Sequence, residues 1–241
     1  MVAISQFKLK GILEAYRGYE GLASSVDVGG GTGKCLHMIT SMYPHIKGIN
    51  YDLPYVIQTA PTFPGIEHVG GDMFSSVPTA EAIMLQNIVH NWSDENCIKL
   101  LKNCYTALPK HGKLIIITVV LLEEPESNKY SMYTSRFDMA MLAHFSSGEE
   151  RTTKELESLC RKAGFSNFQV AFQGFEAVIE SYKFGLKVQP ETPVGDILIQ
   201  RILAHVNNAT ITLQARTGMS MSLPQQLLCR PVVHFNPLAQ I

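Results

Sequence analysis

The stretch VDVGGGTG, residues 26–33, is the most informative part of the sequence. A short run with two valines leads directly into four glycines, and a helical pattern follows. Glycine lets the backbone approach a ligand closely, and the first N–H groups of a helix point outward without partners. The stretch therefore predicts a ligand-binding turn between a buried strand and a helix.

Three kinds of ligand compete for this turn. A phosphate-binding P-loop needs a glycine where Val28 stands and a Ser or Thr where Cys35 follows Lys34. A dinucleotide fingerprint needs its third glycine where Lys34 stands, so a nicotinamide-dependent oxidoreductase is a remote alternative. Asp27, directly before the glycines, would repel a pyrophosphate. It suits a cationic or zwitterionic ligand instead.

Outward from this turn, short runs rich in Ile and Val alternate with helical segments. The expected strands are 25–28, 46–52, 66–70, 82–88 and 113–122, and the expected helices between them are 33–43, 54–60 and 93–108. Apolar runs with little alternation are typical of strands buried on both faces, as in a parallel sheet. The repetition of strand and helix predicts an α/β fold.

Helix boundaries are visible in the same region. Ser93 precedes two acidic residues, which predicts an N-cap hydroxyl with carboxylates at the positive end of the helix dipole. Thr152 and Glu155 have the spacing of a capping box for a helix over 153–163, and Gly164 is expected to end it.

The pattern changes after this helix. Runs 168–173 and 175–183 surround Gly174, which predicts a hairpin, so the sheet is expected to end in an antiparallel pair. Residues 184–241 contain few charged residues and several prolines, and the alternation stops. We expect a tail of weak structure there.

Composition narrows the class of protein. Hydrophobic residues make up 46% of the 241 residues and charged residues 17%, which excludes a disordered chain. Twenty Lys and Arg against 21 Asp and Glu offer no basic excess for nucleic acid. Five scattered cysteines fit neither a disulfide framework nor a metal site, and no apolar run is long enough for a membrane span. A cytoplasmic protein without a structural metal is expected.

Two further acidic residues follow strands and extend the argument about the ligand. Asp52 closes the second expected strand, where a carboxylate can accept both ribose hydroxyls. Asp72 follows the third, where it is placed to meet an adenine, with Met73 as an apolar contact. Together with Asp27 and without a phosphate clamp, they indicate a sulfonium nucleoside, S-adenosylmethionine. The alternative is that both are ordinary turn aspartates.

His90 follows the fourth expected strand and is the candidate general base. Ligands of open α/β sheets lie beyond the carboxyl ends of the strands. A phenol with a pKa of about 10 must lose its proton to attack a methyl group, and an imidazole with a pKa of about 6.5 is a suitable base. Glu150 is the candidate that orients the ring. The alternative for Glu150 is a solvated charge beside Arg151 and Lys154.

Seven motifs carry a resemblance to a known family. VDVGGGTG, INYDLP, GGDMF, VHNWSDENC, LKNCYTALPKHGK, MLAH and ERT resemble the plant small-molecule O-methyltransferases of the caffeic acid O-methyltransferase type. The similarity runs from about Leu9 to Lys183. It implies the class I methyltransferase fold, an α/β Rossmann-like sheet of seven strands that is mostly parallel, with the last strand antiparallel.

The resemblance also implies roles for residues of this chain. The implied contacts of the S-adenosylmethionine cofactor are Gly29, Asp52, Asp72, Met73 and Gln86. The implied base and its flanking acid are His90 and Glu150, and the implied acceptor-site residues are Met141, Asn91 and Phe145. Met141 would help to sandwich the aromatic ring of a small acceptor.

The chain departs from the family pattern at three of these positions and at Thr118. The family's second flanking Glu falls at Thr118, and the acid that usually follows the base is Asn91. A lysine of the cofactor pocket is replaced by Gln86, and an asparagine of the acceptor pocket by Phe145. These changes concern rate and acceptor choice more than cofactor binding.

Three segments are expected from the resemblance. Residues 1–23 resemble only the helix that connects to the family's dimerisation domain, 24–183 the methyltransferase domain, and 184–241 match nothing. Family members are homodimers, and most of the domain that forms the dimer is missing here. The expected function is methylation of a phenolic hydroxyl of a phenylpropanoid or flavonoid-type acceptor. The alternatives are N-methylation of an aromatic amine such as anthranilate, or a truncated cofactor-binding paralogue with little or no turnover.

Overall fold

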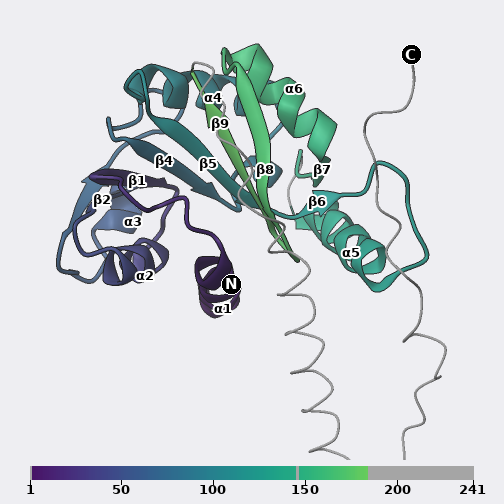
Figure 1. Ribbon diagram of the computed structural model, residues 1–241, viewed down its shortest axis with the longest axis horizontal. Coiled ribbons are helices and arrows are strands. Elements are labelled where there is room, and N and C mark those ends of the chain that lie inside the picture. Colours follow the sequence, from purple (N-terminus) through teal and green to yellow (C-terminus); the bar gives the residue numbers. More distant parts are fainter. Residues whose placement is uncertain (1, 145–146, 184–241) are drawn as a thin grey trace, which may run out of the picture. The chain divides into compact units, whose positions relative to one another are not determined.

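The structure is a computed structural model, and it describes residues 2–144 and 147–183. Seven strands form one sheet in the order β3-β2-β1-β4-β5-β9-β8 (Figure 1). They are β1 (Ser24–Val28), β2 (Lys47–Asp52), β3 (Ile66–Gly70), β4 (Ala82–Gln86), β5 (Lys113–Thr118), β8 (Asn167–Gln173) and β9 (Ala177–Tyr182). A separate parallel pair is formed by β6 (Val120–Leu121) and β7 (Arg151–Thr152).

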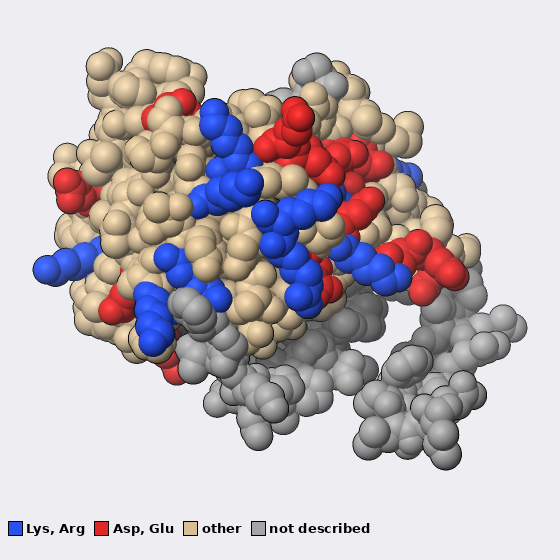
Figure 2. Space-filling model, turned by 90° about the horizontal axis from the view of Figure 1, so that it is seen from above, with Lys and Arg blue, Asp and Glu red and all other residues tan. Residues whose placement is uncertain are grey.

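Within residues 2–144 and 147–183, six α-helices and one short 3₁₀ helix surround the strands. They are α1 (Val2–Ala15), α2 (Lys34–Met42), α3 (Pro54–Ile57), η1 (Val89–Asn91), α4 (Asp94–Ala107), α5 (Lys129–His144) and α6 (Thr153–Ala163). None of the helices in the described ranges has the length and apolar content that a membrane span requires. On the face shown in Figure 2, basic and acidic side chains are interspersed among uncharged ones.

The strand order places the carboxyl ends of five parallel strands along one edge of the sheet. The chain proceeds outward from β1 through β2 to β3, and then returns to β4 on the other side of β1. β5 continues in parallel, and β9 runs antiparallel between β5 and β8. This order confirms the predicted α/β fold with an antiparallel last strand. It also creates a switch point between β1 and β4, where open α/β sheets bind ligands.

The central strands β1, β4, β5 and β9 are buried on both faces, as their apolar runs predicted, whereas the edge strands β3 and β8 are partly exposed. One face packs against α4 and α6, and its core includes Val26, Leu85, Ile116 and Ile179. The other face is covered in part by α1 and by the turn that follows it, where buried Tyr19 donates its hydroxyl to the sulfur of Met84 on β4 at 2.9 Å. Burial on both faces explains why these strands read as continuous apolar runs.

A buried carboxylate fastens Tyr16, the residue directly after α1, to the sheet. Glu180 on β9 accepts hydrogen bonds from the hydroxyls of Tyr16 and Tyr182, from Lys113 Nζ at 2.7 Å and from Gln169 Nε2 at 2.7 Å. Burial raises the pKa of Glu180, but the Lys113 charge and these donors outweigh it and hold this pKa below its usual range. The four donors satisfy the carboxylate, so α1 and the sheet pack as one body.

Helix boundaries agree with the sequence in α6 and differ in α4. In α6 the capping box between Thr152 and Glu155 is present, and Gly164 ends the helix in the left-handed conformation (φ 110°), as predicted. In α4 Ser93 occupies the N-cap position, but its hydroxyl makes no capping hydrogen bond. The predicted hydroxyl cap is therefore wrong, although the helix begins where expected.

Several element boundaries also differ from the prediction. The strand expected over 82–88 ends at Gln86, because Asn87 adopts a left-handed conformation (φ 55°) that extended pairing does not allow. The run expected over 113–122 divides into β5 and β6, and the helix expected over 54–60 ends at Ile57. The sequence interpretation missed α5 entirely. The tail expected over 184–241 lies outside the described residues.

Candidate active site

The glycine turn after β1 is held in place by the end of β2. Gly29 N–H donates to the carbonyl of Tyr51 at 2.8 Å, and Gly31 N–H donates to Asp52 Oδ2 at 2.8 Å. Gly31 has φ 58°, and a Cβ there would meet nothing within 4 Å, so open space borders the turn. A Cβ on Gly30 would lie 2.2 Å from Asn50 Oδ1. The turn thus needs glycine and presents backbone to a ligand.

Beneath the turn lies a buried acid. Asp27 on β1 is 2% exposed, and burial together with the charge of Asp52 raises the pKa of Asp27 to about 7. Two carboxyl groups so close to the glycines create a negative potential around the turn. Such a site disfavours phosphate and favours a cation, as the sequence indicated.

Asp72 is engaged in its own turn after β3. Its Oδ1 accepts the N–H of Phe74 at 2.9 Å and its Oδ2 accepts the hydroxyl of Ser75 at 2.8 Å. These bonds lower the pKa of Asp72. Met73 is half-buried and packs against the core. Asp72 therefore has the local bonds of a turn aspartate, and contact of Asp72 and Met73 with the cofactor stays a prediction.

Gln86, the last residue of β4, has a buried side-chain amide. Its Nε2 is buried and has no hydrogen-bond partner within the described ranges. An unpaired buried amide costs free energy, so such a group is expected where a ligand supplies the acceptor. Gln86 lies on the strand next to β1, so this donor and the glycine turn flank the same switch point.

His90 and Glu150 are brought together from segments sixty residues apart. His90 lies on η1, and its Nδ1 is 2.8 Å from Glu150 Oε1, with the two side chains 9% and 0% exposed. Glu150 is therefore not a solvated charge. A carboxylate at Nδ1 favours the tautomer with the proton on Nδ1 and leaves the Nε2 lone pair available.

The loop that carries Glu150 is held by further bonds. The N–H of Glu150 donates to Asp138 Oδ1 on α5 at 2.9 Å, and the N–H of Glu149 donates to the His90 carbonyl at 3.0 Å. Glu150 Oε2 is buried without a partner in the described part of the chain. Backbone groups on both sides of the His90–Glu150 pair are therefore fixed by hydrogen bonds: the N–H of Glu150 on one side and the carbonyl of His90 on the other.

Arg151 is a structural residue of this site that sequence reasoning missed. Its buried guanidinium donates to the carbonyls of Val89 and Trp92 at 2.8 Å each, and pairs with Asp94 at 3.0 Å and Glu149 at 2.9 Å. The two carbonyls flank η1, so Arg151 clamps the turn that carries His90. Its signals in the sequence were its place in the ERT motif and its position directly after Glu150, and no role was assigned to it.

The residues expected at the acceptor site have different surroundings. Met141 on α5 is 9% exposed, and Asn91 donates its side-chain amide to the Asn87 carbonyl at 3.2 Å. Thr118, at the end of β5, is 1% exposed, and its hydroxyl has no partner among the described residues. Phe145 lies outside the described residues.

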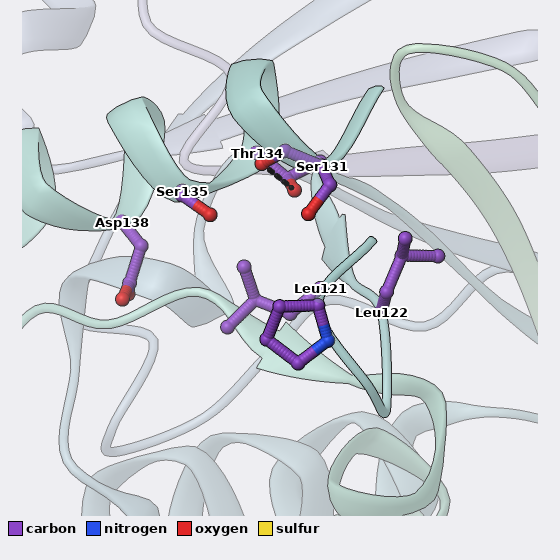
Figure 3. A pocket seen from close by; sticks show the side chains of 7 residues that line it. Leu121, Leu122, Ser131, Thr134, Ser135 and Asp138 are labelled. Atoms are coloured by element: carbon purple, nitrogen blue, oxygen red, sulfur yellow. Dashed lines mark hydrogen bonds between the residues drawn. The ribbon is translucent and has the colours of Figure 1, made fainter. Parts of the chain in front are cut away.

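A cavity of about 220 Å³ adjoins the Glu150 loop. It lies between α5 and the segment after β6 (Figure 3), and it is lined by Leu121, Leu122, Pro125, Ser131, Thr134, Ser135 and Asp138. Neither His90 nor the glycine turn is among the residues that line it. Within 2–144 and 147–183, no group of three or more His, Cys, Asp or Glu is arranged to hold a metal ion.

Comparison with known proteins identifies the family. The profile of the O-methyltransferase domain family matches residues 1–166, and the chain belongs to this family. Among curated relatives, caffeic acid 3-O-methyltransferase of Prunus dulcis is 53% identical over 180 residues, which cover 74% of this chain and 49% of the relative. O-methyltransferase 1 of Lophophora williamsii is 52% identical over 171 residues, covering 71% and 47%. The chain spans about half the length of these relatives.

Solved structures agree with the fold. Human N-acetylserotonin methyltransferase in complex with SAM superposes with a TM-score of 0.68 at 25% identity, covering 76% of this chain and 55% of that one. CalO1, a methyltransferase of calicheamicin biosynthesis in its SAH-bound form, gives a TM-score of 0.69 at 27% identity with the same coverage. The sheet described above is thus the class I methyltransferase sheet.

Proposed function

We propose that this protein transfers a methyl group from S-adenosylmethionine to a phenolic hydroxyl of a phenylpropanoid or flavonoid-type acceptor, with His90 as general base. The hydrogen bond between His90 and the buried Glu150, at the edge of the sheet where ligands bind, carries the proposal. Family membership and about 50% identity to caffeic acid 3-O-methyltransferases support the acceptor class.

The cofactor is S-adenosylmethionine, and the residues of the switch point fit it. The open turn at Gly31, the acid at Asp27 and the unpaired donor of Gln86 suit a nucleoside that carries a cation and a carboxylate. We assign the cofactor contacts to Gly29, Asp52 and Gln86. When bound, this cofactor supplies an electrophilic methyl group on a sulfonium.

The protein's own residues account for proton removal from the acceptor. Glu150 holds the Nδ1 proton of His90, so that Nε2 faces the acceptor as a base and takes the phenolic proton. The charge that forms on the imidazole is stabilised by the adjacent carboxylate. Met141, buried on α5, is the proposed contact for the aromatic ring.

Thr118 favours a second candidate, N-methylation of an aromatic amine. Its unpaired hydroxyl occupies the position where the resemblance expects a second carboxylate beside the base. An aniline nitrogen is already nucleophilic, so a weaker base costs such a reaction less than it costs O-methylation. A homodimer and a cytoplasmic location belong to the same proposal and rest on the resemblance and the cysteine pattern.

Calorimetry and turnover on the purified chain test the proposal. We expect S-adenosylhomocysteine to bind and a panel of catechols and hydroxycinnamates to be methylated on oxygen. Methylation confined to aromatic amines would replace the acceptor class by the second candidate. Binding without any transfer would identify a cofactor-binding protein without turnover, and no binding would contradict the proposal as a whole.

A further inference from the structure

A second buried carboxylate lies at the same edge of the sheet. Glu176 directly precedes β9, and its side chain is 1% exposed. Its Oε1 accepts hydrogen bonds from Lys8 Nζ at 2.8 Å and from Asn87 Nδ2 at 3.2 Å. Its Oε2 is equally buried and has no partner among the residues that the structure describes.

Comparison with Glu180, four residues further along, shows that this arrangement is incomplete. Glu180 receives four donors and serves to hold α1 on the sheet. Glu176 lies in an equally buried position beside the same helix, but one of its oxygens is unsatisfied. A buried carboxylate oxygen without a donor costs free energy, so such a group is expected where a ligand completes it.

The surroundings of Glu176 place it near the cofactor side of the site. Asn87 directly follows Gln86 and precedes the His90 turn by two residues. Burial, together with the negative charges of Asp27 and Glu176, raises the pKa of the Cys35 thiol to about 12. Cys35 lies in the first turn of α2, directly after the glycines. The bond from Asn87 therefore places Glu176 beside the end of β4, the strand next to the one that leads into the glycine turn.

Lys8 connects Glu176 to the acceptor side. Its Nζ lies 4.7 Å from the ring centre of Phe137 and 5.8 Å from that of Tyr133, both on α5. Met141 follows Phe137 by one turn of the same helix. Burial lowers the pKa of Lys8, but the bond and charge of Glu176 outweigh it, so Lys8 stays a cation. The positive charge of Lys8 balances the carboxylate of Glu176. Because Lys8 bonds to Oε1, Oε2 of Glu176 can still accept a hydrogen bond from one further donor.

We infer that Glu176 Oε2 accepts an N–H donor from an ammonium group of a ligand bound in the site. The ammonium has two possible sources, namely the α-ammonium of the cofactor's methionine and an amino group on the acceptor. The placement between the α2 helix and α5 is compatible with both. This inference rests on the proposed function, because it assigns a further contact to the same site.

The cofactor arm of the test uses Glu176→Gln, which keeps the shape of the side chain and removes its charge. S-adenosylhomocysteine is titrated by calorimetry beside an analogue in which hydrogen replaces its α-ammonium group. If the cofactor is the source, Glu176→Gln weakens S-adenosylhomocysteine by about tenfold and leaves the analogue within twofold. Glu157→Gln removes a partly exposed carboxylate of α6 that pairs with Arg161, and it is the matched control, expected to change neither.

The acceptor arm uses a catechol with an aminoethyl chain and the same catechol with an ethyl chain. If the acceptor is the source, Glu176→Gln raises the KM of the first by about tenfold and leaves that of the second unchanged. A selective effect in either arm supports the inference. Equal effects on both members of each pair, or none in either, would overturn it.

Loss of folding is separated from loss of binding by a second variant. Glu176→Gln leaves Lys8 without its partner, so Lys8→Met combined with Glu176→Gln removes both charges together. Thermal unfolding checks that each variant folds. The double variant must show the same selective loss of affinity for the ammonium-bearing member of a pair. If it binds both members of each pair like the parent, the inference is wrong. Failure of the parent chain to bind S-adenosylhomocysteine would contradict the proposed function instead, whatever the variants do.

Discussion

At the scale of single residues, His90 is the group whose removal tests the chemistry most directly. Replacing His90 by Ala should lower turnover by about 10²–10⁴-fold, the usual contribution of a general base. Affinity for S-adenosylhomocysteine should change by no more than a few-fold, because the polar contacts of His90 are with Glu150 and the backbone. Single-turnover kinetics and calorimetry measure the two effects. His111→Ala, in an exposed turn, is the control, and unchanged turnover in His90→Ala would remove His90 from the mechanism.

Asp27 makes stability depend on pH. Its pKa is about 7 in the folded protein against 3.8 in the unfolded chain, so between these values the folded state binds the additional proton. The stabilisation from neutral Asp27 is complete below pH 4 and is lost as the pH rises to about 7. In Asp27→Asn this pH-dependent loss is absent. As the pH rises from 4 to 8, we expect the free energy of unfolding of the variant to increase by about 2–4 kcal/mol relative to that of the parent.

Urea unfolding of both proteins at these two pH values measures this difference. The prediction fails if the free energies of unfolding of parent and variant change in parallel with pH. Asp138→Asn does not serve as a control, because Asp138 holds the backbone of Glu150. Exposed Glu95→Gln, in the first turn of α4, is suitable and should follow the parent.

At the scale of elements, the two helix caps give a matched pair of predictions. Thr152→Ala removes the capping box of α6 and should lower the free energy of unfolding by about 1 kcal/mol. Ser93→Ala should lower it by less than about 0.5 kcal/mol, because the Ser93 hydroxyl caps nothing. Equal losses in urea unfolding would show that the cap assignment of one helix is wrong.

Both caps have the same kind of sequence signal but different outcomes. Thr152 has Glu155 three residues later. The hydroxyl of Thr152 accepts the N–H of Glu155, and the carboxylate of Glu155 accepts the N–H of Thr152, so both hydrogen bonds of this cap form between residues close in the sequence. Ser93 follows the turn that Arg151 clamps, and the Trp92 carbonyl is bound by that guanidinium. A distant side chain therefore shapes the entry to α4, which no local pattern could reveal.

At the scale of the whole molecule, α1 and the sheet should unfold together. Tyr16→Phe removes one of four donors to the buried Glu180 and should cost about 1–3 kcal/mol in the free energy of unfolding. Because Glu180 joins α1 to β5, β8 and β9, the transition should stay single when followed by far-UV and near-UV circular dichroism. Tyr55→Phe, on an exposed side chain, is the control and should change little.

Two separate transitions in the parent protein would contradict this prediction. They would mean that α1 opens while the sheet remains folded. The Lys8 contact with Glu176 and the Tyr19 contact with Met84 argue against this outcome, since the first attaches α1 beside β9 and the second attaches the turn after α1 to β4.

Much of the fold was predictable from local patterns. The glycine turn, the alternation of apolar strands with helices, the capping box at Thr152 and the hairpin around Gly174 depend on residues close in the chain, and the structure confirms each of them. α5 was missed because its buried positions are few and its exposed face carries Met132, Met139 and Leu142, so apolar residues do not mark one side.

The candidate site divides in a similar way. His90 and Asp52 were proposed as site residues from their positions at the ends of strands, because strand order brings carboxyl ends to one edge. The burial of Glu150, the Arg151 clamp and the unpaired oxygen of Glu176 were not predictable, since each depends on partners more than fifty residues away.

Taken by itself, the sequence determined the α/β sheet, the glycine turn and the kind of ligand that the turn accepts, because these follow from periodicity and backbone freedom within short segments. Only the tertiary structure decided which acids are buried and which are local turn residues, as Glu150 and Asp72 illustrate. The physical reason is that the cost of burying a charge is set by the partners that packing brings to it, and those partners come from the whole chain.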